Sequence, residues 1–436
     1  MNSPNREFPN QRLLREGPMH SAATLSPQPH RACGACGASR STVCHHQRFI
    51  VPDGYPLPNK YDVAVCRRCG FVYADPVATQ RDYDRFYCDW SKYDDSATAT
   101  GSGLSPYDAA RLATTASDIA RALPSRAATI LDAGCATGGL LTALRDQGFT
   151  AVAGLDPSPR CAAACRDRGF EAYVGSISTS APAHMPKFDC VVFSHVLEHV
   201  YDIPAFFKAA RHLLAPGGYV YLETPDATRY GDFLYAPFQE FNTEHINHFS
   251  ACALENTARR FGFQPILIEQ KVIQTAEDTL YPAVFGLFRD SGGAADERVV
   301  CDQELPSKIA AYIRHSGEQM ERINHHLAGQ LANTRRVIVW GAGQFAMKLL
   351  ALPCLARTEV RALVDNNPIL RGKTMAGAPI IGPQEVGPHE VAGPLEPIII
   401  ATLLHADEIS AQIRRLGLSN PVLSLLQNSN AEVRRS

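Results

Sequence analysis

An apolar run, Ala128-Thr-Ile-Leu131, leads directly into the stretch Asp132-Ala-Gly-Cys-Ala-Thr-Gly138-Gly139. The run predicts a buried strand, the glycines predict a tight turn, and the residues after them predict a helix to about position 147. A strand, a glycine-rich turn and a helix in this order form a ligand-binding elbow at the carboxyl edge of a parallel sheet. We expect Gly134 to let the backbone approach a ligand and Gly138 to allow close packing at the helix start.

Further strands are expected to join the first one in the same sheet, over 151–155, 172–174, 188–193 and 219–223. The first of these ends in Asp156, whose carboxylate can accept hydrogen bonds from both hydroxyls of a ribose. Ser176 and Ser194 follow the next two strands, so they are expected at the same edge. The turn Ala215-Pro-Gly-Gly218 leads into the last strand.

The pattern Asp-x-Gly-x-x-x-Gly differs from the dinucleotide-binding pattern Gly-x-Gly-x-x-Gly. Together with the acidic strand end and the Pro-Gly-Gly turn, it resembles the motifs of class I methyltransferases, which use S-adenosylmethionine. The resemblance implies a doubly wound α/β domain over residues 105–275. It also implies a set of residues that bind the methyl donor: Asp132, Gly134, Gly138, Asp156, Ser176 and Ser194. Many relatives carry Asp where this chain has Ser176, so the contact to adenine is expected to differ.

Two cysteine pairs stand ahead of this domain, in a segment that we assign to residues 31–100. They are Cys33 with Cys36 and Cys66 with Cys69, and a glycine follows each pair at once. This spacing predicts a tetrahedral zinc site, because each short turn can direct two thiolates at one ion. With four protein ligands the zinc would be structural, and no catalytic metal is implied. Four reduced cysteines without metal, or a redox pair, are the alternatives.

The candidate residues for acceptor chemistry lie in two histidine-containing stretches. His199 ends the stretch Ser194-His-Val-Leu-Glu-His199, directly after the strand over 188–193. Glu244 and His245 stand in the loop between the fifth strand and the last helix of the sheet domain. A carboxylate can orient an imidazole there, and the imidazole can act as a base.

The order of zinc module, methyltransferase domain and Rossmann-like tail is similar to that of the C-methyltransferases of deoxysugar pathways. Those enzymes methylate a carbon beside the ketone of a nucleotide-linked 4-keto sugar. The Glu-His pair and the downstream His248-Phe-Ser250 carry this resemblance. It implies that His245 is the base, and that His199 and Glu244 position or polarise the keto group. This chain has Asn242 where the family has a tyrosine shortly before Glu-His.

Other functions stay open at this point. One is O- or N-methylation of a saccharide or secondary metabolite, since Leu-Glu-His-Val is common among methyltransferases of many specificities. Another is a zinc scaffold without enzymatic activity, although the intact glycines and Asp156 oppose it.

The remaining sequence predicts a connector and a second nucleotide-fold-like domain. Apolar positions spaced as on one helix face indicate a long helix over 304–333, within a connector over 276–334. A strand, the turn Gly341-Ala-Gly343, a helix and Asp365 at the next strand end then predict a Rossmann-like α/β domain over 335–436. A dinucleotide site is one interpretation of this turn. The other, from the resemblance, is a degenerate domain that bounds the acceptor cleft, where the turn, Gln344 and His405 approach a nucleotide-sugar phosphate.

Bulk properties exclude several classes of protein. The 436 residues carry a formal net charge of -2, so a chain-wide basic field for nucleic acid is absent. No apolar run reaches the length of a membrane helix. The 13 cysteines are odd in number and no export signal is evident, which favours a reducing cytoplasm over a disulfide framework. Residues 1–30 are rich in polar residues and proline and are expected to be disordered. The expected partner is a small molecule.

Overall fold

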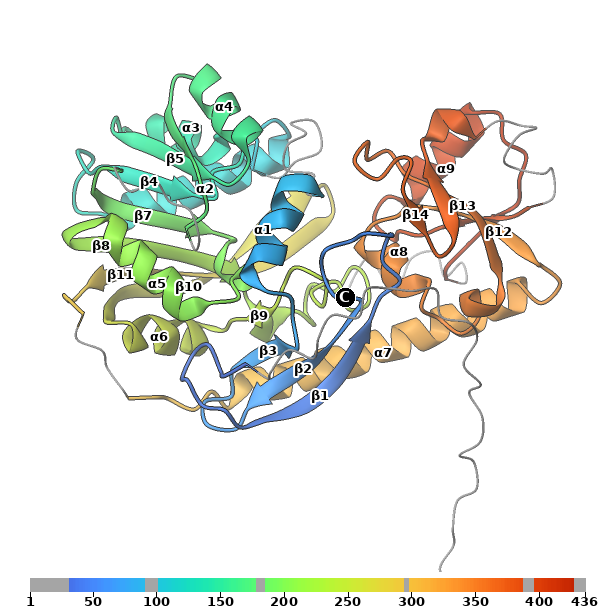
Figure 1. Ribbon diagram of the computed structural model, residues 1–436, viewed down its shortest axis with the longest axis horizontal. Helices are drawn as coiled ribbons and strands as arrows, with labels where there is room; N and C mark the ends of the chain where they lie inside the picture. The colour runs from blue at the N-terminus through green and yellow to red at the C-terminus, as the bar shows by residue number, and fades with distance from the viewer. Residues whose placement is uncertain (1–30, 91–100, 178–184, 294–297, 387–395, 427–436) are drawn as a thin grey trace, which may run out of the picture.

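The computed structural model describes residues 31–90, 101–177, 185–293, 298–386 and 396–426. The disorder expected at residues 1–30 lies outside this part of the chain. The described residues form three sheets, one each in the N-terminal segment with the cysteine pairs, the central domain and the C-terminal domain (Figure 1). Within this part of the chain, no helix combines the length and the apolar character that a membrane crossing requires.

The central sheet has seven strands in the order β10-β11-β8-β7-β4-β5-β6. Their bounds are Phe263–Ala276 for β10, Thr279–Asp290 for β11, Leu214–Pro225 for β8, Phe188–Ser194 for β7, Ile130–Ala133 for β4, Val152–Asp156 for β5 and Glu171–Val174 for β6. The strands from β8 to β6 are mutually parallel, whereas β11 is antiparallel to both of its neighbours. The carboxyl ends of β4, β5, β6 and β7 therefore meet at one edge, as the sequence predicted.

Helices cover both faces of the central sheet (Figure 1). On one face, α2 (Pro106–Ala122) and α3 (Gly139–Asp146) bury apolar side chains against β4, β7 and β8. On the other, α5 (Ile203–Leu213) and α6 (Ala251–Arg260) pack Phe206, Phe207 and Leu254 into the main core. The short helix α4 (Pro159–Asp167) links β5 to β6. Burial of both faces explains why the parallel strands are almost continuously apolar.

The boundary expected near residue 275 differs from the structure. The sequence assigned residues 276–334 to a helical connector, but β11 lies inside the central sheet between β8 and β10. Residues 282–288 of β11 are all buried, so this strand belongs to the domain core. The connector proper is the helix α7 (Glu304–Gln330), close to the predicted range.

The N-terminal segment forms a second sheet from β1 (Ser41–Arg48), β2 (Lys60–Cys66) and β3 (Val72–Asp75), followed by α1 (Gln80–Asp89). The fourth strand, β9 (Asn247–His248), comes from the loop after β8 and pairs with β3. The segment therefore shares its sheet with the central domain.

The C-terminal segment forms a third sheet of six strands in the order β14-β15-β13-β12-β16-β17. Its strands are β12 (Arg336–Trp340), β13 (Glu359–Val364), β14 (Thr374–Met375), β15 (Ala378–Ile381), β16 (Ile398–Ile400) and β17 (Val422–Leu423), and its helices are α8 (Gln344–Leu349) and α9 (Ala406–Arg415). Only the β14–β15 pair is antiparallel among these described strands. The C-terminal segment is therefore an α/β domain with a mostly parallel sheet.

Candidate active site

A cavity of about 540 Å³ opens at the carboxyl edge of the central sheet. All three segments line it. The helix α1 contributes Gln80, Asp84 and Tyr87, the loop after β16 contributes Leu404 and His405, and most of the other lining residues come from the central domain. Five of the six residues predicted to bind the donor, together with His199 and His245, are among the lining residues. These are Asp132, Gly134, Asp156, Ser176 and Ser194 at one end and His199 and His245 at the other. One space therefore joins the donor edge to the histidines.

The glycine turn between β4 and α3 has the conformation that its sequence requires. Gly134 has φ +92° and Gly138 has φ +86°, in the left-handed region that favours glycine. A Cβ on Gly134 would lie 2.9 Å from Val196, and one on Gly138 would lie 3.0 Å from Cys165. Gly138 thus serves helix packing beneath the cavity, which explains why it does not itself line the cavity.

Asp156 lies at the end of β5, with an exposed fraction of only 8%. Its Oδ2 accepts from the backbone N–H of Ala136 in the glycine turn at 2.9 Å, and its Oδ1 accepts from that of Ser158 at 2.8 Å. These bonds fix the carboxylate at the cavity wall. Burial, reinforced by the charge of Asp156, raises the pKa of Asp132 to about 7.

The structure shows two further polar groups that line the cavity near the donor residues, those of Ser194 and Arg111. Ser194 Oγ is buried and has no hydrogen-bond partner among the described residues, so it can serve a bound molecule. Arg111 on α2 lines the same end, and its guanidinium pairs with Asp108 at 2.8 Å. Arg111 was missed because nothing in a helical stretch far from the glycine turn shows that its side chain reaches the cavity.

At the other end of the cavity, His199 and His245 face each other, with ring centroids 4.9 Å apart. His199 Nδ1 lies 3.1 Å from the backbone carbonyl of Glu244, which can only accept. Nδ1 therefore carries the proton, and Nε2 of the neutral ring is an acceptor. Burial lowers the pKa of His199 to about 4, so this ring is neutral near pH 7.

The carboxylate that contacts His245 is Glu240, not the adjacent Glu244. His245 Nδ1 lies 3.3 Å from Oε2 of Glu240, which also accepts from the hydroxyl of Tyr281 at 2.8 Å. Burial opposes the charged imidazole, but the carboxylate of Glu240 outweighs it and raises the pKa of His245. The Glu244 side chain instead lies 3.5 Å from the amide of Gln344. Glu244 therefore contacts the histidine pair through its backbone carbonyl, which lies beside His199 Nδ1.

A buried row of charges supports the histidine pair from below. His195, with φ +57°, places Nδ1 at 3.2 Å from Glu198 and Nε2 at 3.5 Å from Glu223. Glu223 in turn contacts Lys271 at 2.9 Å. Burial lowers the pKa of His195, but the two carboxylates outweigh it and raise this pKa to about 9. His195 is therefore a half-buried cation beside two buried carboxylates, a role that the sequence did not indicate.

Glu198, His199 and His245 together could hold a metal ion. Each offers one ligand atom, and these atoms lie within 4.8 Å of one another. Glu198 Oε2 is buried without a hydrogen-bond partner among the described residues. Both histidines also have an acceptor near Nδ1, an arrangement that is common behind metal-binding imidazoles. The sequence had pointed to only one metal site.

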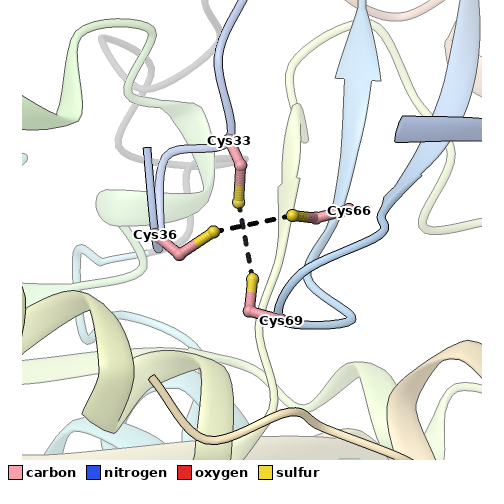
Figure 2. A group of neighbouring side chains, drawn as sticks. All are labelled: Cys33, Cys36, Cys66 and Cys69. Carbon is pink, nitrogen blue, oxygen red and sulfur yellow. Dashed lines mark hydrogen bonds between the residues drawn. The ribbon is translucent and has the colours of Figure 1, made fainter. Parts of the chain in front are cut away.

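The four N-terminal cysteines do form a cluster of the predicted kind. Figure 2 shows their sulfur atoms pointing toward a common centre, with Cys33 to Cys69 and Cys36 to Cys66 both at 3.6 Å. A tetrahedral zinc with sulfur ligands needs sulfur separations of about 3.8 Å, so the set fits this ion. All four cysteines are buried and no disulfide joins them. Arg260 of α6 donates to the carbonyl of Gly34 at 2.8 Å and fixes the cluster to the central domain.

Around the glycine turn of the C-terminal domain, polar groups form hydrogen bonds with other residues of the protein. Asp365 accepts from the backbone N–H of Ala342 at 2.7 Å, and Gln344 contacts the loop that carries His245. His405 lines the cavity, as proposed from the sequence, whereas Gly341 and Gly343 are not among its lining residues.

Known proteins resemble this chain mainly in the central domain. Residues 107–268 match the family model of a methyltransferase domain, and residues 333–422 match a model described as C2185-like, N-terminal. The ubiquinone biosynthesis O-methyltransferase of Methylobacterium nodulans is 34% identical over 116 residues, which are 26% of this chain and 46% of that protein. The human mitochondrial protein of that name is 33% identical over 120 residues, 26% of this chain and 32% of that protein.

The chain therefore spans less than half the length of these curated relatives. Among solved structures, Burkholderia thailandensis 1,6-didemethyltoxoflavin-N1-methyltransferase with bound S-adenosylhomocysteine is 17% identical, with a TM-score of 0.37. That comparison covers 53% of this chain and 98% of that one. The family match, the strand order and the glycine turn agree with one another. Residues 107–268 form a methyltransferase domain with the class I, S-adenosylmethionine-dependent fold.

Proposed function

We propose that this protein transfers a methyl group from S-adenosylmethionine to a carbon acid, the carbon beside the ketone of a nucleotide-linked 4-keto sugar. One observation carries the proposal: a histidine pair backed by buried carboxylates closes the cavity that begins at the glycine turn. Such an arrangement suits an acceptor that must lose a proton before it reacts. The proposal extends the resemblance to sugar C-methyltransferases noted from the sequence.

The residues divide into those that bind the donor and those that prepare the acceptor. Asp156 would hold the ribose hydroxyls, and Gly134 would allow the backbone to approach the donor. Bound S-adenosylmethionine supplies an activated methyl group on a sulfonium. His245 would remove the acceptor proton, while Glu240 holds its ring and stabilises the imidazolium that results. That imidazolium would remain beside the enolate and offset its charge.

Of the two roles implied for His199, we propose positioning rather than polarisation of the acceptor. Its Nδ1–H is used on the carbonyl of Glu244, so its neutral ring cannot polarise a ketone by donating a hydrogen bond. We propose that Nε2 accepts from a hydroxyl of the sugar and orients it.

The nucleotide part of such an acceptor would lie outward from the histidines. Among the described residues that line the cavity, Arg111 is the only lysine or arginine, and it is paired with Asp108 at the donor end. A diphosphate would gain little binding energy there, because a charged group that leaves water needs an oppositely charged partner and Arg111 is already paired. The nucleotide would therefore extend past His405 toward the C-terminal domain.

A solvent-exchange experiment tests the proposal. The purified protein is incubated in deuterium oxide with 4-keto nucleotide sugars, without the methyl donor, and deuterium at the carbon beside the ketone is measured. We expect exchange with the wild type and none with His245→Ala. Calorimetry with S-adenosylmethionine and its demethylated product runs in parallel. Absence of donor binding would instead favour the scaffold without activity.

O-methylation of a saccharide or secondary metabolite is the second candidate. The curated relatives named above are O-methyltransferases, and Glu198, His199 and His245 form a set that fits a divalent cation. Such a cation, held by these three side chains, would lower the pKa of a bound hydroxyl. Methyl transfer to a hydroxyl acceptor that stops with a chelator and returns with Mg²⁺ or Mn²⁺ would establish it. Carbon-acid exchange that survives the chelator would support the first proposal.

A further inference from the structure

The segment that carries Glu240 and His245, residues 238–245, contains no helix or strand, and we name it the catalytic loop. Within this loop, Asn242 Oδ1 accepts from the backbone N–H of Glu244 and of His245, both at 2.8 Å. A loop without a repeating hydrogen-bond pattern depends on outside contacts to hold a catalytic group in place.

Thr243 ties the catalytic loop to both neighbouring segments. Its hydroxyl lies 2.7 Å from the hydroxyl of Tyr55 in the N-terminal segment and accepts from Gln344 Nε2 at 2.7 Å. Its backbone N–H donates to Gln344 Oε1 at 3.2 Å. Because one amide both donates to and accepts from Thr243, the orientation of the Gln344 side chain is fixed. Thr243 has an exposed fraction of only 2%, so water competes little for these bonds.

Gln344 occupies a particular place in the C-terminal fold. It is the first residue of α8 and follows directly on the turn Gly341-Ala-Gly343. In a dinucleotide-binding domain this position faces the phosphates of the ligand. Here its side chain crosses to another domain.

A second residue on the same helix reaches the other end of the loop. Lys348 lies four residues after Gln344, has an exposed fraction of 3% and donates to the backbone carbonyl of Phe238. Residues four apart lie on the same face of a helix. The helix α8 therefore contacts the catalytic loop at both Phe238 and Thr243.

We infer that Gln344 is a positioning residue for the histidine pair and acts through Thr243. The residue after Thr243 supplies the carbonyl that fixes the tautomer of His199, and the next residue is His245 itself. A small displacement of Thr243 thus moves both rings relative to the cavity. The inference deepens the proposed function and rests on it.

The test compares Gln344→Ala with Gln384→Ala, an exposed glutamine of the same domain. We expect Gln344→Ala to slow acceptor exchange by about tenfold or more, because displacement by about 1 Å is costly in catalysis. Affinity for S-adenosylmethionine should not change, since Gln344 does not line the cavity. The control should match the wild type in both measurements.

Two further measurements separate positioning from loss of structure. If Gln344 acts through Thr243, the double variant of Gln344→Ala with Thr243→Val should be no slower than the worse single variant, whereas Thr243→Ser should retain the rate. Nitrogen NMR of the imidazoles should show the Nδ1–H form of His199 in the wild type and a mixture in Gln344→Ala. This readout needs no acceptor, so it stands even if the proposed substrate is wrong. Additive losses, or unchanged imidazole signals, would overturn the inference.

Discussion

His245 Nδ1 lies 3.3 Å from a carboxylate oxygen of Glu240, five residues earlier in the same loop. This contact raises the pKa of His245 against the opposing effect of burial. The folded protein therefore keeps a proton on His245 to higher pH than a free imidazole would, and the base form appears only as the pH rises through this raised pKa.

Replacing Glu240 by Gln should lower the pKa of His245. The limb where the rate rises with pH would then move to lower pH, while the plateau would fall by about tenfold or more because the ring loses its orientation. The exchange rate measured between pH 5 and pH 10 gives both values. Glu244→Gln is the comparison and should move the limb less, because Glu244 raises the pKa of His245 only through the weaker effect of its charge. If the pH limb moved in Glu244→Gln but not in Glu240→Gln, Glu244 and not Glu240 would be the carboxylate that acts on His245.

Asp156→Ala should weaken donor binding by about 1–3 kcal/mol, because the carboxylate would lose buried hydrogen bonds to the ribose. Titration calorimetry with S-adenosylmethionine measures this loss. Asp146→Ala, an exposed residue at the end of α3, should have no effect. Equal affinity of the Asp156 variant and the wild type would remove Asp156 from the donor site.

Cys66→Ser should release zinc and lower the melting temperature by about 5 °C or more, since metal binding contributes directly to folding. Elemental analysis and thermal unfolding give the two readouts. Cys44→Ser changes an exposed cysteine outside the cluster and should retain one zinc per chain. Wild-type protein that contains no zinc after expression with added zinc would contradict the assignment.

Lys271→Met should destabilise the protein by about 3–5 kcal/mol, because it leaves the buried carboxylate of Glu223 with only the more distant ring of His195 as a cation. Glu223 has an exposed fraction of 0% at this contact. Arg336→Met breaks the exposed pair with Glu359, and such pairs contribute only about 0–1 kcal/mol. Urea unfolding of both variants measures the difference. Similar losses in the two would mean that the buried row is not needed for stability.

Much of the fold could be predicted from the sequence, because local signals and strand ends agree. The glycine turn, Asp156 at its strand end and the cysteine pairs each depend on residues that are close together in the chain. The strand β11 was missed because an antiparallel strand inserted between two others has no local signal of its place in a sheet. Its burial depends on pairing with β8, which lies more than 50 residues earlier.

The candidate site was harder to predict, because its geometry depends on side-chain direction. Glu244 stands next to His245 in the sequence, yet neighbouring residues in an irregular loop point in different directions. Glu240 is the other carboxylate of the same short stretch, and its place five residues before His245 is the only signal that the sequence offers for their contact. Glu198 lies in the stretch 194–199 between His195 and His199, but no local pattern in the sequence shows that this glutamate is buried.

Because β3 pairs with β9, removal of the N-terminal segment would disturb the loop that carries His245. Asn247 and His248 form β9 only two residues after His245, and they pair with β3 of the segment that carries the four clustered cysteines. A shortened chain that starts at α2 would keep every donor-binding residue but would leave this edge unpaired. We expect such a fragment to retain affinity for the methyl donor while its histidines lose their fixed arrangement. In the full chain, the cysteine cluster would therefore stabilise, through β3 and β9, the histidines that carry out acid–base chemistry.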